Sequence, residues 1–200
     1  MTQALAKLRP VEAPNDIDLA AAESAARALL QALGIPLTSE SVRDTPRRIA
    51  QMYAELLTPA PFAPTTFPND GGYDELVVVT GIPFHSLCEH HLLPFTGVAH
   101  VAYLPGDRII GLSKLARVVE SFARSLQVQE RLTTQVAGWL DEHLRPKGVG
   151  VVLEAEHLCM SLRGVQKPGS RTVTSALLGH LRDDPRTRQE FLSLTRADRP

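Results

Sequence analysis

Residues 86–105 read SLCEHHLLPFTGVAHVAYLP and hold both a strand signal and a group of metal-binding residue types. The second half, Val98 to Leu104, is a run of apolar and β-branched residues closed by Pro105-Gly106-Asp107, which predicts a strand followed by a turn. Leu76 to Thr80 is another β-branched run upstream and predicts a second strand. The centre of the chain is therefore expected to be β-structure.

Helical patterns lie on both sides of these strands. Helices are predicted over about 19–33, from Thr45 with one apolar face (Ile49, Met52, Tyr53, Leu56), from Ser113 with a core stripe that ends at Leu126, over about 128–144, and over about 185–194. Two further strands are predicted over 150–156 and 172–178. Because helices and strands are grouped rather than strictly alternating, this order predicts the α+β class with a largely antiparallel sheet of four strands.

Three regions are expected along the chain. Residues 1–17 are polar and aperiodic and predict a flexible N-terminal tail. Residues 18–72 form a helical region that ends in a proline-rich connection, 58–72, predicted to hold no regular element. Residues 73–200 form the sheet-containing domain.

The composition is that of an ordinary globular protein. The chain has 200 residues, of which 44% are hydrophobic and 22% charged, with a formal net charge of -1, which excludes a disordered chain and binding to nucleic acid or membranes by bulk charge. No apolar run approaches the roughly 18 residues of a membrane span, and the N-terminus lacks a signal-peptide core. With two cysteines, a cytoplasmic protein with reduced thiols is predicted.

Both cysteines lie beside histidines, in Cys88-Glu89-His90-His91 and in His157-Leu158-Cys159. Thiolate and imidazole are preferred zinc ligands, and Cys88 and His91 have the short spacing that lets two side chains reach one ion. Cys159 follows a predicted strand and can supply a third ligand. Three protein ligands leave a position for water, which is the arrangement of catalytic zinc. His90 and His157 then remain beside the metal as candidates for proton transfer.

Other interpretations of these residues stay open at this point. Cys88 and Cys159 are ordinary buried thiols if the histidines serve only packing or the surface. A disulfide between them is disfavoured by the predicted compartment. A zinc deaminase also uses one histidine and two cysteines, but its H-x-E and P-C-x-x-C signature is absent from the sequence.

Several polar groups are candidates for binding a phosphorylated ligand. A helix start with serine, lysine and arginine favours phosphate, although each cluster alone is also typical of a solvated face. The clusters are Ser113, Lys114 and Arg117; Arg163, Lys167 and Arg171; and Arg47 with Arg48. Glu130, beside Gln129, can accept hydrogen bonds from a guanine-like N–H and amino pair, but a glutamate at a helix start is also common. No Walker loop or GxGxxG motif is present.

Several blocks of sequence, in the same order and spacing, resemble GTP cyclohydrolase I. They are SLCEHHLLPFTGVAHVAYLP (86–105), IGLSKLAR (110–117), QVQERLT (127–133), EAEHLCMSLRGV (154–165) and TVTS (172–175). DTPRRIA (44–50) and RQEFL (188–192) extend the match, so the resemblance covers about 21–194.

The resemblance implies an enzyme that converts GTP and water into formate and 7,8-dihydroneopterin triphosphate, the entry step of tetrahydrofolate and, in some organisms, biopterin synthesis. It implies the tunnelling fold, an antiparallel four-stranded sheet with helices on one face. Sheets of neighbouring subunits would join into a barrel, in a homodecamer of two pentamers with sites at subunit interfaces. GTP is then the small-molecule partner, and neither nucleic acid nor a membrane is expected.

Residue by residue, the resemblance implies a Zn²⁺ site of Cys88, His91 and Cys159. It implies catalytic roles for His90, His157 and Ser113. It implies substrate contacts from Gln129, Glu130, Lys114, Arg117, Arg163 and Arg48. The alternatives are a related cyclohydrolase that stops at a different product, a non-catalytic nucleotide- or pterin-binding module with structural zinc, and a structural oligomer without metal.

Overall fold

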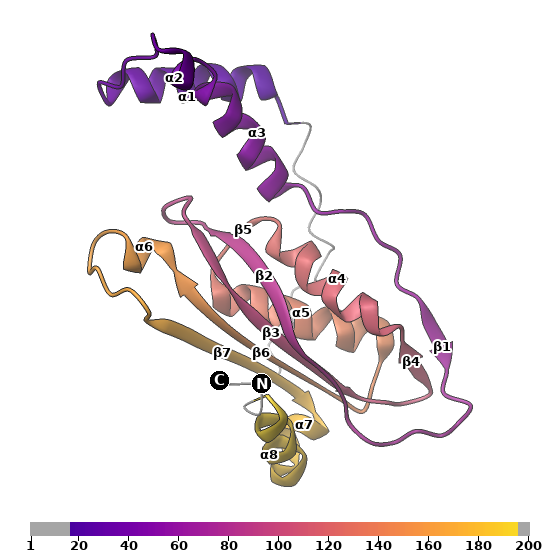
Figure 1. Cartoon of the computed structure of the whole chain (residues 1–200). Coiled ribbons are helices and arrows are strands. Elements are labelled where there is room, and N and C mark those ends of the chain that lie inside the picture. Colours follow the sequence, from indigo (N-terminus) through magenta and orange to yellow (C-terminus); the bar gives the residue numbers. More distant parts are fainter. Residues whose placement is uncertain (1–16, 196–200) are drawn as a thin grey trace, which may run out of the picture. The chain divides into compact units, whose positions relative to one another are not determined.

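The computed structural model describes residues 17–195, which its contacts divide into a helical unit ending at residue 59 and a sheet unit that begins at residue 60 (Figure 1). The predicted tail, 1–17, lies outside the described residues except for Ile17. The boundary predicted at residue 73 stays a prediction, although these contacts group residues 60–72 with the sheet. Among the described residues, no helix is both long and apolar enough to cross a membrane.

The helical unit contains α1 (Leu19–Ala32), α2 (Glu40–Arg43) and α3 (Thr45–Leu57). The Asp18 carboxylate caps α1 by accepting a 2.9 Å hydrogen bond from the Ala21 N–H, and α1 packs on α3. Both long helices were predicted, α3 from its periodicity and α1 from its alanine content, a capping aspartate and the stop at Gly34 and Pro36. The Thr45-Pro46 pair indicates Thr45 as the N-cap of α3, but Asp44 holds that position and Thr45 is already helical.

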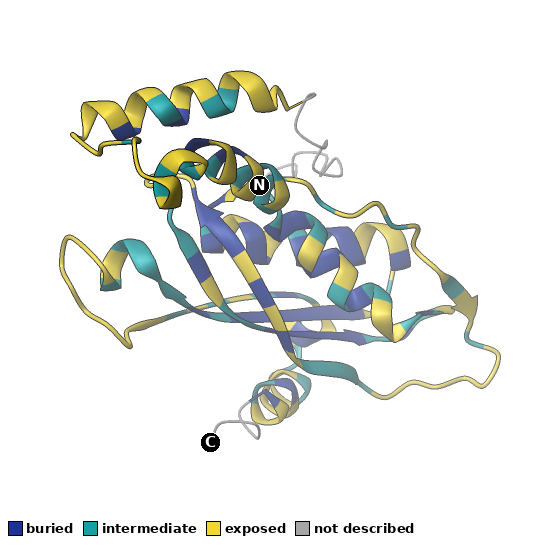
Figure 2. Ribbon diagram, turned by 45° about the horizontal axis from the view of Figure 1, so that its top comes forward, coloured by how far each residue is buried: buried dark blue, intermediate teal, exposed yellow. Residues whose placement is uncertain are grey.

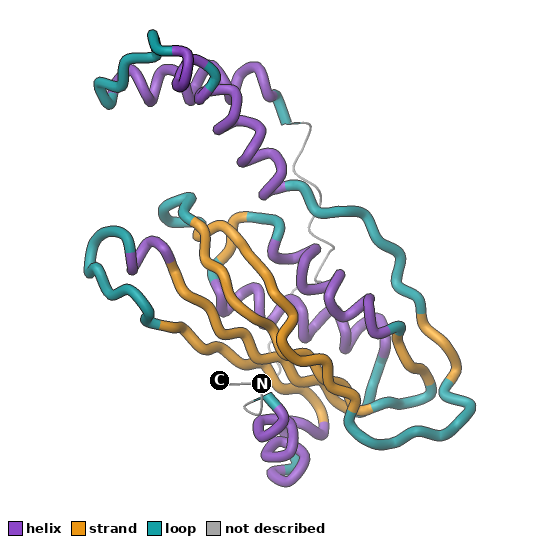
Figure 3. Tube along the Cα trace, in the orientation of Figure 1, coloured by secondary structure: helices purple, strands orange, loops and turns teal. Residues whose placement is uncertain are grey.

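The sheet unit is built on five strands in the order β5-β2-β3-β6-β7 (Figure 3). The long strands are β2 (Val77–Cys88), β3 (Pro94–Leu104), β6 (Gly148–His157) and β7 (Arg171–Gly179), and neighbours among them pair antiparallel. The short β5 (Leu126–Gln127) pairs parallel with Leu87 and Cys88. The α+β class is therefore confirmed, and the expected four strands become five.

Strand β2 runs far beyond the predicted end at Thr80. Gly81 and Pro83 break the sequence pattern there, but the structure accommodates both: the register shifts between Val79 and Ile82, with Gly81 at φ 66°. β2 pairs with β3 alone over most of its length, and proline is tolerated in such an edge strand. This continuation carries the strand to Cys88.

Helices cover both faces of the sheet, not one face as expected. On one face, α4 (Leu112–Ala123) and α5 (Gln129–Leu144) bury Val118, Leu132 and Leu140 against alternate residues of β3 and β6 (Figure 2). On the other face, Leu181 and Phe191 of α7 (His180–Asp183) and α8 (Pro185–Leu194) pack with a second cluster of buried residues, Ala102, Val152 and Leu177.

Two helix details also differ from expectation. Gly111, not Ser113, precedes α4, and Ser113 lies inside its first turn. Leu126 is 41% exposed in β5 rather than part of the α4 core stripe. The proline-rich connection is not wholly irregular, because β1 (Thr66–Pro68) pairs antiparallel with β4 (Arg108–Ile110).

Candidate metal centre and its surroundings

A tight turn between β2 and β3 presents two of the predicted metal ligands. The Cys88 N–H donates to the Leu93 carbonyl at 2.9 Å, and the Leu92 N–H donates back to the Cys88 carbonyl at 2.9 Å. Leu92 is left-handed, at φ 55°, which reverses the chain within a few residues. The turn thereby folds His91 back over Cys88.

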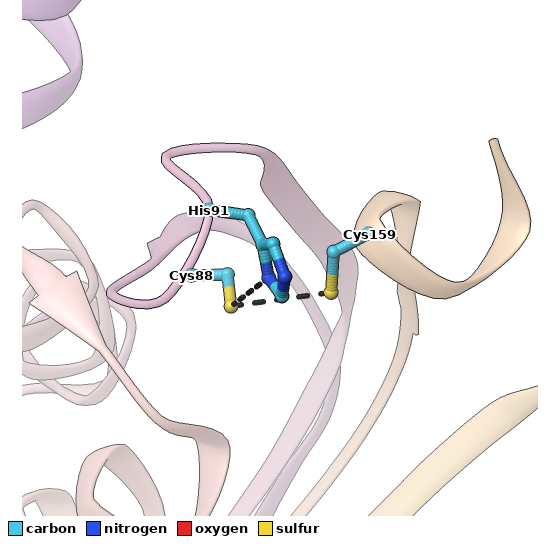
Figure 4. Close-up of side chains that lie close together, drawn as sticks. All are labelled: Cys88, His91 and Cys159. Atoms are coloured by element: carbon cyan, nitrogen blue, oxygen red, sulfur yellow. Dashed lines mark hydrogen bonds between the residues drawn. The ribbon is translucent and has the colours of Figure 1, made fainter. Parts of the chain in front are cut away.

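Cys159 completes the cluster from α6 (Leu158–Ser161), directly after β6. The ligand atoms of Cys88, His91 and Cys159 all lie within 4.8 Å of one another, and their side chains point toward a common centre (Figure 4). The Cys88 Sγ lies 3.9 Å from the Cys159 Sγ and 3.9 Å from the His91 Nδ1. The thiols are therefore not joined as a disulfide, and these donors can hold a metal ion.

Arg163 lies beside this cluster and has a small influence on its charge. Burial raises the pKa of the Cys159 thiol, and the neighbouring Cys88 raises it further, while the Arg163 guanidinium acts in the opposite direction. Arg163 also donates from Nη1 to the His91 Nε2 at 3.0 Å. The structure therefore places the predicted substrate-binding Arg163 at the edge of the metal cluster.

A second arginine, Arg131, makes hydrogen bonds to and beside the turn between β2 and β3 that carries Cys88 and His91. It was not identified from the sequence. The Arg131 Nη2 donates to the Glu89 carboxylate at 2.5 Å and to the Leu126 carbonyl at 2.8 Å, and its Nε donates to the Gln127 Oε1 at 2.9 Å. The Glu89 N–H also donates to the Gln127 carbonyl at 3.1 Å. Gln127 lies in β5 and Arg131 in the first turn of α5, so no helical spacing indicated their hydrogen bond.

The two remaining histidines have different surroundings. His90 has an exposed side chain, with its Nδ1 3.7 Å from the Cys88 Sγ and its Nε2 3.9 Å from the Glu89 carboxylate. His157, the last residue of β6, is half-buried, and its Nε2 lies 2.8 Å from the Gln129 Oε1. Burial lowers the pKa of His157, and the Glu130 carboxylate opposes this shift.

Within the described part of the sheet unit, three of the predicted residues are not joined to this cluster. Ser113, Lys114 and Arg117 lie on the first two turns of α4, and within residues 17–195 no hydrogen bond or ion pair links them to the cysteines or histidines. Arg48 lies on α3 in the helical unit. The sheet unit thus brings together the candidate metal ligands, His90, His157, Gln129 and Arg163, and Glu130 lies near enough to His157 to influence its pKa.

Known proteins are similar to this chain over the residues that form the candidate site. The sequence profile of GTP cyclohydrolase I matches residues 22–196. The chain is 51% identical over 180 residues to GTP cyclohydrolase 1 of Aquifex aeolicus (strain VF5), covering 90% of this chain and 98% of that protein. It is 53% identical over 178 residues to GTP cyclohydrolase 1 of Streptococcus thermophilus (strain CNRZ 1066), covering 87% and 95%.

Among solved structures, the archaeosine synthase QueF-Like in the apo form aligns over 52% of this chain and 93% of that chain, with 16% identity and a TM-score of 0.44, which is too distant a likeness to support a conclusion. The family profile, by contrast, spans the metal cluster and both histidine segments, and the relatives match along nearly their whole length. The chain therefore belongs to the GTP cyclohydrolase I family.

Proposed function

We propose that this protein hydrolyses and rearranges GTP to 7,8-dihydroneopterin triphosphate and formate, the first step of tetrahydrofolate and pterin synthesis, in a zinc-dependent reaction. The observation that carries the proposal is the gathering of Cys88, His91 and Cys159 within 4.8 Å, inside a chain whose relatives at about 50% identity are named GTP cyclohydrolase 1. Net consumption of one water balances the release of C8 as formate.

The donor spacing supports zinc as the metal. Zinc–sulfur bonds of about 2.3 Å in a tetrahedron place two sulfur ligands about 3.8 Å apart. The two cysteine sulfurs are 3.9 Å apart, so they can share one such ion without rearrangement of the backbone. When bound there, zinc supplies a Lewis acid that lowers the pKa of water near to neutrality.

The two spare histidines supply proton transfer in this proposal. His157 protonates N7 of the guanine while water adds at C8, so that the imidazole ring opens and C8 leaves as formate. His90 and Ser113 carry protons in the later steps, in which the ribose opens, rearranges and closes onto the freed amine. Positioned proton transfer of this kind contributes about 10²- to 10⁴-fold in rate.

Recognition of GTP is divided between its base and its triphosphate. The Glu130 carboxylate accepts hydrogen bonds from the guanine N1–H and its amino group. Lys114, Arg117, Arg163 and Arg48 neutralise the triphosphate and hold the base over the metal, and binding energy from this remote group supports the chemistry. Gln129 belongs to the same predicted set, and its role is argued below.

The open edges of the sheet support assembly of the protein into a larger oligomer. In the described sheet, β7 has no partner on its outer side, and β2 has only the two-residue β5 on its own. Open edges of this kind favour edge-to-edge joining of sheets. We propose the tunnelling fold, with a barrel of such sheets in a decamer of two pentamers, sites at subunit interfaces, and a cytoplasmic location.

A turnover assay with GTP, with and without a zinc chelator, tests the proposal. Formate and an oxidised, fluorescent pterin should appear together and both should disappear with the chelator. Formate without pterin would indicate a related cyclohydrolase that stops early. Neither product, from assembled protein that contains zinc, would contradict the proposal in favour of a binding module.

Three variants separate the roles. Cys88→Ser should lose zinc and turnover together. His157→Ala should keep zinc and lose ring opening, and a fully active variant would exclude that role. Glu130→Ala should lose guanine recognition; normal handling of GTP by this variant would leave Glu130 as an ordinary carboxylate at the start of a helix.

A further inference from the structure

The side-chain amide of Gln129 has a fixed orientation. Its nitrogen lies 3.2 Å from the Leu153 carbonyl oxygen and 3.0 Å from the Thr172 carbonyl oxygen. Carbonyl oxygens only accept hydrogen bonds, so the NH₂ group must face them and the amide oxygen must face the other way. Gln129 is 2% exposed, so water does not compete for these bonds.

Thr174 and Thr133 also help to hold the Gln129 side chain in this orientation. The Gln129 NH₂ also donates to the Thr174 hydroxyl at 3.1 Å. The Thr133 hydroxyl donates to the backbone carbonyl of Gln129 at 2.7 Å, so the Thr174 hydroxyl, 2.7 Å away, must donate to Thr133. Each hydroxyl proton thus has one partner, and the glutamine is tied to α5, β6 and β7 together.

The orientation of Gln129 decides which nitrogen of His157 carries a proton. The Gln129 Oε1 lies 2.8 Å from the His157 Nε2. Since an amide oxygen cannot donate, Nε2 must be the donor and carry hydrogen. The Nδ1 atom has no hydrogen-bond partner within residues 17–195, so it is the nitrogen left for exchange of a proton with a ligand.

The plane of the His157 ring is held by a separate contact. Phe95 is directly opposite His157 in the pairing of β3 with β6, and it is fully buried. The two rings stack with centroids 4.6 Å apart and planes within 2° of parallel. Phe95 therefore fixes the ring plane, and Gln129 fixes the direction in which Nε2 points within that plane.

We infer that Gln129 is a positioning residue for His157 and not a contact to guanine. It holds His157 with hydrogen on Nε2 and directs Nδ1 to the substrate. Since the Nε2–H is bonded to Gln129, Nδ1 is the ring nitrogen that remains for contact with the substrate. The catalytic part of this inference rests on the proposed function, whereas the tautomer is a property of the protein itself.

Solid-state ¹⁵N NMR of zinc-loaded protein labelled at its histidine rings reads the tautomer directly, at about pH 8.5, where an ordinary imidazole is neutral. Comparison with His157→Gln assigns the signals of this ring. We expect protonated Nε2 and unprotonated Nδ1. Hydrogen on Nδ1 with Nε2 bare would overturn the inference, whether or not the protein turns over GTP.

Gln129→Met supplies the kinetic test, because it keeps the length of the side chain and removes both polar atoms. We expect kcat to fall at least about tenfold, within the range for positioned proton transfer, while KM for GTP changes less than about threefold. A raised KM with intact kcat would instead assign Gln129 to the guanine and refute the inference. The matched control Thr174→Val removes one bond to the same amide but leaves both carbonyls, so the His157 tautomer should be retained.

If Gln129→Met does not fold, the measurement on the wild-type protein still decides the tautomer. Absence of GTP turnover in the wild type, with Nε2 protonated, would reject the proposed function and keep the positioning contact. The two conclusions are thus tested separately.

Discussion

Arg131 connects three parts of the metal-ligand turn, and Arg131→Ala removes all three connections at once. Its guanidinium bridges the Glu89 carboxylate, the Leu126 carbonyl and the Gln127 side chain. Glu89 lies between ligand Cys88 and His90, so loss of Arg131 should loosen the turn. The cluster keeps all its ligands in this variant, and the effect on metal binding is therefore indirect.

The size of the effect follows from the exposure of the groups. The side chains of Arg131 and Glu89 are 42% and 33% exposed, so their ion pair contributes only about 0.5 kcal/mol after screening by solvent. Gln127 is 1% exposed, and its Oε1 would lose the Arg131 hydrogen bond, which costs about 1 kcal/mol. With the bond to Leu126, the unfolding free energy should fall by about 2 kcal/mol.

That figure sets an upper bound on the loss of metal affinity. If all of about 2 kcal/mol acts on the conformation that binds zinc, the affinity falls about 30-fold, since about 1.4 kcal/mol corresponds to tenfold. We expect a loss between about 10- and 30-fold, in the range found when groups that orient metal ligands are removed.

Competition against a chromophoric chelator measures this affinity. Arg27→Ala is the matched control, because Arg27 makes a comparable ion pair with Glu23, at 3.3 Å, within α1. The control should bind zinc like the wild type. A loss of less than about twofold in Arg131→Ala would refute the reasoning, because it would show that the turn holds its shape without the bridge.

Three further predictions concern the scaffold. In Gly97→Ala, the new Cβ would lie 1.9 Å from the Glu154 carbonyl oxygen, so strands β3 and β6 must separate, and we expect a large drop in Tm by calorimetry. The control Gly71→Ala, with open space around the new Cβ, should have the Tm of the wild type. Leu132→Ala should lower the unfolding free energy in urea by about 2–5 kcal/mol, because Leu132 is fully buried. Hydrogen bonds at the start of α8 lower the pKa of Asp184 from its ordinary value of 3.8, so the ionised carboxylate stabilises the fold fully above that pH and progressively less as the pH falls through the lowered pKa. The difference in Tm between the wild type and Asp184→Ala should therefore narrow as the pH falls below 3.8, and a constant difference would contradict this role.

The helices and strands that were predicted correctly are those whose signal comes from residues close together in the chain. The 3.6-residue periodicity of α3 and α5, the cap and stop residues of α1 and the proline at the start of α8 each act within a few turns of one helix. Strand β2 was predicted too short because Gly81 and Pro83 are local signals for a break, while the pairing with β3 that overrides them comes from distant residues. The two-residue β5 exists only through its pairing with Leu87 and Cys88, so no local pattern could indicate it.

In the candidate site, too, residues close together in the chain could be predicted, and those brought together by distant elements could not. Cys88 and His91 are three residues apart, and their approach followed from spacing, whereas the arrival of Cys159 required a strand to end beside them. Arg131 and Phe95 were missed because an arginine in a helix and a phenylalanine in a strand have ordinary roles by default. What makes each one part of the site is the direction of its side chain, which depends on the pairing of elements far apart in the chain.

In the proposed site, the adjacent residues Gln129 and Glu130 have different roles. The amide of Gln129 is buried, and both its nitrogen and its oxygen have partners within the protein. To bind guanine, it would have to give up its hydrogen bonds to two carbonyls and a histidine, and each hydrogen bond lost costs about 0.5–1.5 kcal/mol. Glu130, one residue along α5, is exposed, and its carboxylate makes no hydrogen bond within residues 17–195. In the proposed site, Glu130 can therefore bind the base without loss to the fold, while the Gln129 amide is already hydrogen-bonded to the histidine proposed to act on that base.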